Sequence, residues 1–302
     1  MTGVLNVNKP AGRTSHDVVQ SIRSMTGESR VGHTGTLDPL ATGVLLLCLG
    51  VATRISQFLS NLDKTYVATI RLGVTTDTWD ADVTILEKRP VQITENDIRG
   101  TLPLFVGQIR QIPPMYSAVK HDGVRLYHLA RAGHVVERSH RTVHIHGIEM
   151  LRYAGEDLTV RIRCSKGTYI RSLAADLGTR LGCGAHITAL QRERIGTFGV
   201  DNSLHLQEIE HLCQERTLSN HIMSINDALC HLPEIRIEKE YQMRIEHGTT
   251  VSMNDALFSE HLRQGREPVR LIGENNRLLG LGTVELDRSQ SALSVRPIRV
   301  FV

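Results

Sequence analysis

One carboxylate, Asp38, stands in a loop that is dense in turn-forming residues. The loop covers residues 32–43 (GHTGTLDPLATG) and holds three glycines, with Pro39 directly after the carboxylate. Glycine lets a backbone bend sharply or approach a ligand closely, and proline fixes the φ angle. Asp38 is therefore our candidate catalytic group.

The pair Asp38-Pro39 also has a purely structural interpretation. An Asp followed by Pro is typical of a helix start, where the Asp side chain caps the first turn and the Pro takes the first helical position. Without its neighbours, such a pair is more often a cap than part of an active site. The surrounding residues have to decide between the two interpretations.

Residues 32–43 as a whole resemble the catalytic box of the TruB family, the tRNA pseudouridine-55 synthases. In that box the Asp of a Leu-Asp-Pro-Leu-Ala-Thr-Gly sequence is the essential residue, and residues 37–43 match it without a gap. Thr36 stands where the family leads us to expect Ala. The resemblance implies a pseudouridine-synthase fold, isomerisation of uridine 55 in the T loop of tRNA, and Asp38 as the nucleophile.

The resemblance implies two further catalytic residues. Tyr66, within residues 63–68, matches a Lys-x-Tyr motif whose ring stacks on the target uracil and whose hydroxyl is placed to take the C5 proton. Arg171, within residues 165–173, matches a motif whose Arg pairs with the catalytic Asp. Such a cation would keep Asp38 ionised in a desolvated pocket. Outside this family, a strand Tyr is more often core and an Arg at a helix start is more often a surface residue.

Four substrate-binding residues are also implied, namely Lys9, His33, Tyr169 and Leu190. An enzyme that acts on a stacked loop uridine must extrude the base, and His33 matches the family histidine that takes the vacated place. Tyr169 and Leu190 match pocket positions, although both residue types also serve for packing. Lys9 lies in an Asn-Lys-Pro box where the family usually has Asp-Lys-Pro, and we expect this box to support the catalytic loop.

No metal or organic cofactor is expected. The isomerisation breaks the bond between N1 and C1′ and rejoins the uracil through C5, so nothing is oxidised or hydrolysed. The five cysteines are widely spread without a Cys-x-x-Cys pair, which favours free thiols. His144 and His146 are interpreted as two imidazoles on one strand face rather than as a metal site.

Composition indicates a globular protein, whereas charge by itself is only weak evidence for a polyanionic partner. The chain has 302 residues, 40% of them hydrophobic, and a formal net charge of +3. Basic residues cluster at 120–131, 161–166 and 192–194, although such runs are usually solvated faces. The longest apolar run, residues 44–49, is far short of the roughly 20 residues that span a bilayer. No presequence precedes the first strand, so we expect a cytoplasmic protein without a membrane segment. The expected partner is the T arm of tRNA, recognised by its folded shape, with no obligatory protein partner and a monomeric state.

The hydrophobic patterns predict an α+β fold with a central mixed, largely antiparallel sheet flanked by helices. Strands are expected at residues 3–7, 44–49, 65–72, 142–150 and 158–164. Helices are expected from Ser15, whose hydroxyl is a candidate cap, and at residues 52–62, from 94 toward 105, 126–132, 170–181 and within 204–229. An Asp-Gly hairpin turn is expected at residues 121–124.

A domain boundary is expected near residue 232. Residues 1–232 would form the catalytic domain, and residues 233–302 would form a small β-rich module with a hairpin at 269–286 and a last strand at 293–302. In the TruB family the equivalent segment is a PUA-like RNA-binding domain.

Two other functions remain open. The first is an RNA-binding or RNA-remodelling protein with a vestigial catalytic apparatus, which the presence of Asp38, Tyr66 and Arg171 disfavours. The second is a guide-dependent pseudouridine synthase like the Cbf5 or dyskerin proteins. The chain carries no Lys-rich tail, which favours independence from a guide RNA.

Overall fold

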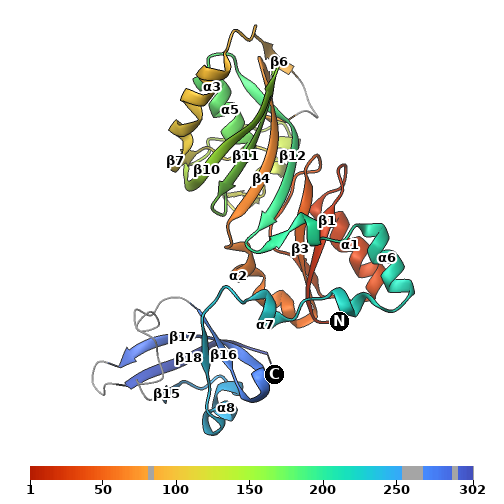
Figure 1. The fold of residues 1–302 in the computed structure, drawn as a ribbon, viewed down its shortest axis with the longest axis vertical. Helices are drawn as coiled ribbons and strands as arrows, with labels where there is room; N and C mark the ends of the chain where they lie inside the picture. The colour runs from red at the N-terminus through yellow and green to blue at the C-terminus, as the bar shows by residue number, and fades with distance from the viewer. Residues whose placement is uncertain (81–84, 254–267, 288–291, 302) are drawn as a thin grey trace.

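The chain folds around two β-sheets, as the expected α+β class requires (Figure 1). The computed structural model describes residues 1–80, 85–253, 268–287 and 292–301. A nine-stranded sheet occupies the first two thirds of the chain, and a five-stranded sheet occupies the last part. Among the described helices, none is long and apolar enough to cross a membrane.

The larger sheet is mixed and largely antiparallel, as expected. Its strand order is β1-β3-β12-β4-β11-β10-β7, with β2 added to β3 and β13 added to β12, and only the contact between β12 and β3 is parallel among the described pairs. The strands are β1 (Gly3–Lys9), β2 (Val31–His33), β3 (Thr42–Leu49), β4 (Lys64–Leu72), β7 (Gly107–Gln111), β10 (Arg141–Ala154), β11 (Asp157–Cys164), β12 (Ala185–Ile195) and β13 (Phe198–Gly199).

The parallel contact is a short seam in the middle of this sheet. Strands β12 and β3 pair through two residue pairs, Gln191 with Thr42 and Arg192 with Gly43. On one side of the seam lie β1, β2 and β3, and on the other side lie β12, β4, β11, β10 and β7. The loop that carries Asp38 joins β2 to β3, so the topology places this carboxylate beside the seam.

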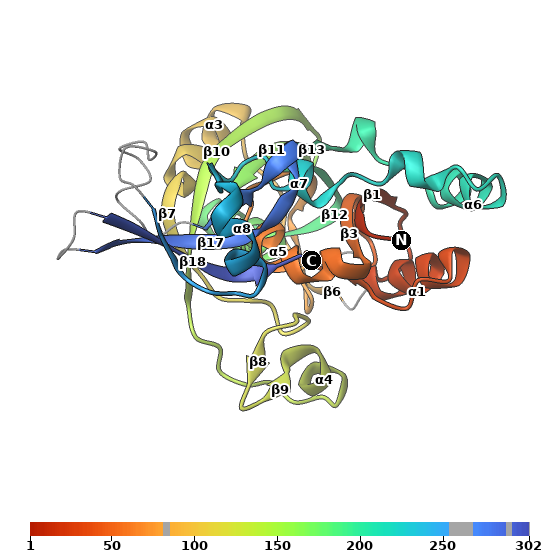
Figure 2. The ribbon, with the colours of Figure 1, turned by 90° about the horizontal axis from the view of Figure 1, so that it is seen from below.

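Helices cover both parts of the sheet. Helix α1 (Ser15–Thr26) and helix α6 (Leu206–Gln214) lie side by side against β1 and β3, as Figure 2 shows from below. The other face of β3 packs against the 3₁₀ helix η1 (Gly50–Ile55), α2 (Ser56–Ser60) and α7 (Ile225–Ala228). Helices α3 (Glu95–Thr101) and α5 (Ile170–Arg180) contribute to the hydrophobic core on the side of the seam that holds β12, β4, β11, β10 and β7.

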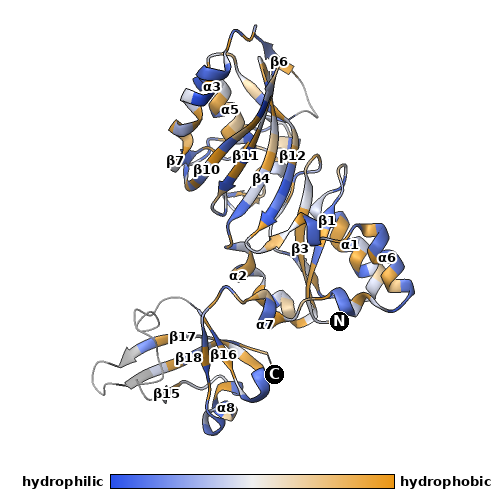
Figure 3. Cartoon of the chain, in the orientation of Figure 1, coloured by the Kyte–Doolittle hydropathy of each residue, from blue (hydrophilic) through white to orange (hydrophobic). Residues whose placement is uncertain are grey.

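The apolar run in β3 explains why this strand can lie at the centre of the part of the sheet formed by β1, β2 and β3. Alternate side chains enter two different clusters, with Leu46 on the side of α2 and Leu47 on the side of α1 and α6. All of residues 43–49 are buried, and Figure 3 shows the strand as hydrophobic along its length. Each fully buried leucine stabilises the fold by about 1.5–3 kcal/mol. The expected buried free thiols are present at Cys48, Cys164 and Cys183.

The expected cap of α1 was wrong by one residue, and the difference matters for the site. Thr14 is the N-cap, and its hydroxyl accepts a hydrogen bond from the Asp17 amide at 3.1 Å while the Asp17 carboxylate accepts from the Thr14 amide at 2.8 Å. The Ser15 hydroxyl is buried and instead bonds both backbone groups of Leu37, accepting at 2.8 Å and donating at 3.2 Å. Ser15 therefore anchors the loop that precedes Asp38.

Asp38 and Pro39 do not begin a helix. The Ala41 amide donates to the Asp38 carbonyl at 3.1 Å, which closes a turn with Pro39 at its second position, and β3 follows directly. The expected single helix at residues 52–62 is also wrong, because the chain forms η1 and then the short α2. The interval 204–229 holds α6, the 3₁₀ helix η4 (Leu218–His221) and α7 rather than one long helix.

A lobe formed by residues 112–140 leaves the sheet between β7 and β10. It contains the expected hairpin, made of β8 (Lys120–His121) and β9 (Val124–Arg125), followed by α4 (Leu126–Arg131). In Figure 2 these three elements stand away from both sheets. A second hairpin, β5 (Val74–Thr76) with β6 (Ile85–Lys88), extends from the end of β4.

The C-terminal part is β-rich, as expected. Its five strands have the order β14-β16-β17-β18-β15, and α8 (Lys239–Glu246) packs against them. Strands β16 and β17 form the expected hairpin, while residue 302 of the expected last strand lies outside the described residues. The bounds are β14 (Glu234–Arg236), β15 (Val251–Met253), β16 (Val269–Ile272), β17 (Leu278–Asp287) and β18 (Ala292–Val300).

The C-terminal sheet is attached to the rest of the chain by apolar contacts. Leu281 belongs to the same hydrophobic cluster as Leu229 and Phe58, and Phe301 packs against this cluster. The Arg54 guanidinium also donates to the Val300 carbonyl at 2.9 Å. The last strands thus pack directly on the η1 and α7 side of the first part.

The seam gives a stability prediction. Gly43 has φ +97°, and a Cβ there would lie 2.3 Å from the Arg192 carbonyl oxygen. We expect Gly43→Ala to lower the free energy of unfolding by about 3 kcal/mol, because left-handed strain and a backbone clash add. Urea unfolding followed by circular dichroism measures this change.

Gly155→Ala is the matched control. Gly155 also has positive φ, +63°, but a Cβ there meets nothing within 4 Å. We therefore expect a loss of only about 1 kcal/mol from the conformational strain alone. Equal losses in the two variants would contradict the tight approach of β3 to β12.

Candidate active site

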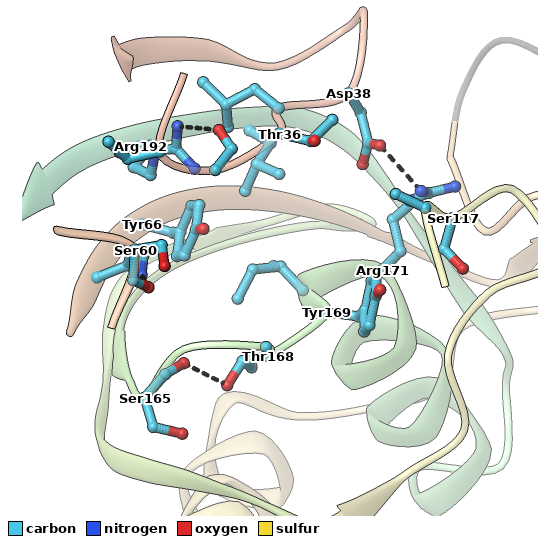
Figure 4. Close-up of a pocket in the computed structure, with 18 residues that line it drawn as sticks. Thr36, Asp38, Ser60, Tyr66, Ser117, Ser165, Thr168, Tyr169, Arg171 and Arg192 are labelled. Carbon is cyan, nitrogen blue, oxygen red and sulfur yellow. Dashed lines mark hydrogen bonds and ion pairs between the residues drawn. The ribbon is translucent and has the colours of Figure 1, made fainter. Parts of the chain in front are cut away.

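A polar cavity of about 260 Å³ lies where the two parts of the larger sheet separate (Figure 4). It collects residues from the Asp38 loop, from β4 and β12, from the start of α5 and from the lobe. Its lining comprises Thr34, Gly35, Thr36, Leu37, Asp38, Ser60, Lys64, Tyr66, Ser117, Ala118, Ser165, Gly167, Thr168, Tyr169, Ile170, Arg171, Leu190 and Arg192.

The structure brings Asp38 and Arg171 together, as the sequence led us to expect. The Arg171 Nη2 lies 2.9 Å from Asp38 Oδ1, and the dashed line in Figure 4 marks this contact. The Arg171 side chain is 4% exposed, whereas the Asp38 side chain is 30% exposed toward the cavity. The carboxylate thus faces the space where a substrate would lie, and its counter-ion is held behind it.

Arg171 is fixed by acceptors from three separate segments. Besides Asp38, its guanidinium donates to the Tyr116 carbonyl at 2.6 Å and to the Thr78 carbonyl at 3.2 Å, and it lies 3.5 Å from Asp80 Oδ2. A planar guanidinium with five N–H groups can satisfy such a set in one orientation. The position of the cation is therefore determined by the protein before any substrate binds.

Burial raises the pKa of the Asp38 carboxyl above its ordinary value. The positive charge of Arg171 opposes this effect, and the negative charge of Asp80 adds to it. Desolvation disfavours a charged carboxylate, and a fixed cation within hydrogen-bond distance favours it. The site thus combines a poorly solvated carboxylate with a counter-charge that keeps ionisation accessible.

Sequence reasoning missed Asp80. This residue is buried, shares Arg171 with Asp38 and accepts a hydrogen bond from the Thr78 hydroxyl at 2.6 Å. Residues 77–80 follow β5 without any periodic pattern, so nothing in the sequence indicates that they turn back toward α5. Their proximity to Arg171 depends on tertiary packing alone.

Tyr66 lies in the cavity, with 8% of its surface exposed. Burial raises the pKa of its phenol, and the positive charge of Arg192 opposes that rise. Figure 4 shows the ring across the cavity from the Asp38–Arg171 pair. The structure therefore places the expected catalytic Tyr in the same cavity as the expected nucleophile.

Arg192 was expected only as part of a basic cluster, yet it is a buried cavity residue with 1% exposure. Its Nε donates to the Val44 carbonyl at 2.7 Å, and its Nη2 donates to the Gly35 carbonyl at 3.1 Å. It therefore ties β12 to β3 and to the catalytic loop at the seam. A β-bulge between Arg192 and Arg194 places the two side chains differently, and such a bulge is not readable from the sequence.

Two of the expected substrate-binding residues, Tyr169 and Leu190, line the cavity. Tyr169 directly precedes α5, and its backbone amide donates to the Gln111 side chain at 3.1 Å. Burial raises the pKa of the Tyr169 phenol. Tyr169 is half-buried and Leu190 is buried, and both offer largely apolar surface to the cavity.

His33 lies at the end of β2, next to the cavity residue Thr34, but does not itself line the cavity. Burial and the positive charge of Arg192 lower the pKa of its imidazole. Its Nδ1 is buried and has no hydrogen-bond partner among the described residues. His33 is thus an uncharged flat ring at the rim of the site at neutral pH.

Lys9 was expected as a substrate-binding residue, and the structure corrects this expectation. It is fully buried outside the cavity lining, and its ammonium donates to the carbonyls of Pro10, Arg13 and Pro39. Burial lowers its pKa to about 8. Because its three N–H groups are already used, Lys9 supports the turn after Asp38 and does not reach the substrate.

The described residues contain no cluster of three or more His, Cys, Asp or Glu side chains that could hold a metal ion. His144 and His146 lie on one face of β10 with ring centroids 4.8 Å apart, as expected for alternate strand positions. His146 lies 2.8 Å from a carboxylate oxygen of Asp63. These imidazoles form a strand-surface pair.

Comparison with known proteins finds relatives over most of the chain. Residues 23–170 match the family described as TruB family pseudouridylate synthase (N terminal domain), and residues 171–230 match the tRNA pseudouridylate synthase B C-terminal domain. The chain is 47% identical over 255 residues to a tRNA pseudouridine synthase B of Dehalococcoides mccartyi, covering 84% of this chain and 85% of that protein. It is 41% identical over 290 residues to the enzyme of the same name from Stutzerimonas stutzeri, covering 95% and 93%.

Two solved structures with the same fold are chains of larger complexes. A chain of a Cbf5-Nop10-Gar1 complex superposes with a TM-score of 0.78 at 28% identity, covering 100% of this chain and 85% of that chain. A chain of an H/ACA ribonucleoprotein bound to a substrate RNA containing 2′-deoxyuridine superposes with a TM-score of 0.75 at 25% identity, covering 100% and 85%. Both matches extend through the C-terminal sheet.

The shared cation gives a prediction about pH. If Asp38 must be ionised to react, the rate falls as the pH decreases through the raised pKa of Asp38. The acid limb of the pH–rate profile then has its midpoint above 3.8, the ordinary pKa of Asp. We expect Asp80→Asn to move this limb to lower pH, because a negative charge that disfavours ionised Asp38 is removed. Single-turnover rates on a tRNA transcript across the pH range measure the limb.

Asp77→Asn serves as the control, since Asp77 is an exposed carboxylate three positions away in the same segment. We expect its acid limb to coincide with that of the unmodified protein. If Asp80→Asn also leaves the limb in place, Asp80 has no electrostatic influence on the reacting group.

Proposed function

Because this chain belongs to the TruB family of pseudouridylate synthases, we propose that it isomerises uridine 55 in the T loop of tRNA to pseudouridine. The observation that carries the proposal is the pairing of Asp38 with the buried Arg171 in a cavity that Tyr66 and Leu190 also line. A carboxylate with a preformed counter-charge is what covalent chemistry at the ribose or the uracil requires.

The reaction is an isomerisation and consumes no second substrate. The bond between N1 and C1′ breaks, the detached uracil turns, and C5 forms a new bond with C1′. The proton on C5 then leaves, and N1 carries a proton in the product. A closed cavity that retains the uracil is essential, since a lost base would leave an abasic site.

Asp38 is proposed as the nucleophile. It can attack C1′, add to C6 of the uracil, or assist elimination to a glycal, and all three routes need an ionised carboxylate at this position. Arg171 stabilises that charged form and fixes its orientation through a hydrogen bond of 2.9 Å. The turn closed by Ala41 and supported by Lys9 holds the carboxylate toward the cavity.

Tyr66 is proposed to stack on the uracil and to receive the C5 proton. A buried phenol with a raised pKa is a poor base by itself. The charge of Arg192 favours the phenolate, so the two residues work as a pair. This assigns a catalytic contribution to a cation that also holds the catalytic loop through the Gly35 carbonyl.

His33, Tyr169 and Leu190 are proposed to receive the flipped nucleotide. Extruding a stacked base costs a few kcal/mol, which contacts in the pocket and a replacement in the stack offset. His33 suits the replacement because its lowered pKa leaves a neutral, flat ring at the rim. Tyr169 and Leu190 offer cavity surfaces that can contact the base.

The proposed partner is the T arm of tRNA, recognised mainly by shape. The lobe at residues 112–140 contributes Ser117 and Ala118 to the cavity and carries cations in its hairpin, among them Lys120 and Arg125. We propose that residues 233–302 form a PUA-like module that adds RNA contacts, with residues 1–232 as the catalytic domain. Catalysis is proposed to occur in the cytoplasm, by a monomer without cofactor or obligatory protein partner.

A guide-dependent activity is the second candidate, because the fold matches chains from H/ACA assemblies. The curated relatives with 41–49% identity are instead named tRNA pseudouridine synthase B. A reaction that contains only purified protein and a tRNA transcript distinguishes the two. Turnover without any guide RNA supports the stand-alone enzyme.

The central test is Asp38→Asn. We expect this variant to keep its affinity for tRNA and to lose all tritium release from C5-labelled uridine, because an amide cannot act as the nucleophile. Filter binding measures the affinity, and charcoal adsorption of the remaining RNA measures the released tritium. Full turnover by this variant would exclude the proposed mechanism.

Position 55 is tested separately. Treatment with a carbodiimide that leaves adducts on pseudouridine stops reverse transcription next to the modified residue. We expect one enzyme-dependent stop at position 55 and none in a transcript that carries cytidine there. Asp77→Asn, which changes an exposed carboxylate outside the cavity, controls for general effects of losing one negative charge.

A further inference from the structure

Arg138 and Trp79 form a contact that the catalytic chemistry does not use. The Arg138 guanidinium carbon lies 5.8 Å from the centroid of the Trp79 ring, within the range of a cation–π interaction. The same guanidinium donates to the Pro113 carbonyl at 3.0 Å. Arg138 therefore connects the two ends of the lobe at residues 112–140 and also joins them to Trp79.

Trp79 stands directly between two residues that hold Arg171. The Thr78 carbonyl accepts from Arg171 at 3.2 Å, and the Asp80 carboxylate lies 3.5 Å from it. Trp79 has φ +62°, which is rare for a bulky side chain and requires support from its surroundings. This backbone conformation turns the residues on both sides of Trp79 toward the same guanidinium.

Two short connections support the strained residue. The Trp79 carbonyl accepts from the Ile187 amide of β12 at 3.2 Å, and the indole ring is covered by Arg138. The first contact fixes the backbone to the sheet, and the second fixes the side chain to the lobe. Loss of the second contact would release the ring while leaving the sheet intact.

A parallel connection runs through the lobe itself. Pro113, which accepts from Arg138, lies three residues before Tyr116, whose carbonyl accepts from Arg171 at 2.6 Å. Directly before Pro113, the Ile112 carbonyl accepts from the Ser172 hydroxyl of α5 at 2.7 Å. Arg138 thus reaches three of the four acceptors of Arg171 through residues it contacts directly.

We propose that Arg138 and Trp79 act as a clamp that couples the position of the lobe to the alignment of Arg171 with Asp38. When RNA holds the lobe, the clamp fixes Thr78, Asp80 and Tyr116 around the guanidinium, and the nucleophile is oriented for reaction. Arg138 and Trp79 are positioning residues, since neither lines the cavity. The inference rests on the proposed function for its substrate, but not for its geometry.

The geometry can be tested without activity, because Trp79 is the single tryptophan of the chain. Its fluorescence therefore reports the clamp directly in the full-length protein. We expect Arg138→Met to raise the acrylamide quenching constant about twofold, because the ring loses the planar group that covers it. An unchanged quenching constant and emission maximum would show that the clamp does not exist in solution.

The coupling is tested by single-turnover rates at saturating tRNA. We expect Arg138→Met and Trp79→Leu each to lower the rate about tenfold, with dissociation constants for tRNA changed less than about threefold, because misalignment affects the reaction more than binding. The double variant should be no slower than the slower single variant, since both changes break one contact. Trp79→Phe keeps an aromatic face and should restore most of the rate.

Arg131→Met is the matched control, because Arg131 covers another ring of the lobe, Tyr127, at 5.7 Å. The backbone amide of Tyr127, not its ring, bonds the Ser117 carbonyl beside Tyr116, so removing the cation from the ring leaves that hydrogen bond in place. The saturated rate of this variant should equal that of the unmodified protein. Unchanged saturated rates in the clamp variants, or additive losses in the double variant, would overturn the coupling. Normal turnover by the unmodified protein in the same assay separates that outcome from a failure of the proposed function.

Discussion

The structure depends on one buried ion pair, that of Arg171 with Asp38. A guanidinium with 4% side-chain exposure is stable only when its N–H groups are satisfied, and here carbonyl and carboxylate oxygens from two segments besides the Asp38 loop surround it. Removing one partner of such a pair typically costs about 3–5 kcal/mol, because the other charge remains buried and unpaired. The surrounding elements can therefore be understood as the means of holding this cation in place.

The split in the larger sheet creates the space for that pair. A continuous sheet would fill the position of the cavity with paired strands, whereas β3 and β12 touch through only two residue pairs and then diverge. Gly43 allows β3 to approach β12 closely. The Arg192 side chain then joins the two strands by donating hydrogen bonds to β3 and to the loop that follows β2. The catalytic loop is thus held at both ends, by Arg192 at the seam and by Ser15 and Lys9 on the side of α1.

The sequence predicted what depends on local pattern and missed what depends on register. The alternation in β4, the uninterrupted apolar run of β3 and the helix start at Thr94 all depend on local sequence, and each element begins within two residues of the expected position. The motifs around Asp38, Tyr66 and Arg171 identified side chains that the fold then brought together. Asp80 and Arg192 were not identified as site residues, because Asp80 lies in an irregular segment and Arg192 is placed by a β-bulge. Lys9 was recognised by its box, but only the structure shows that carbonyls occupy its ammonium.

The electrostatics of the cavity explain why the cation must be held so firmly. Burial raises the pKa values of Asp38, Tyr66 and Tyr169 alike, so the empty cavity already disfavours negative charge. A uracil that enters displaces water and raises this penalty further, at the moment when the proposed reaction needs an ionised Asp38. A mobile cation would move away from the carboxylate or pair with another acceptor. A cation that is fixed by backbone carbonyls cannot do so, and its attraction for Asp38 grows as the local dielectric constant falls. Substrate binding would then strengthen the interaction that keeps the proposed nucleophile charged.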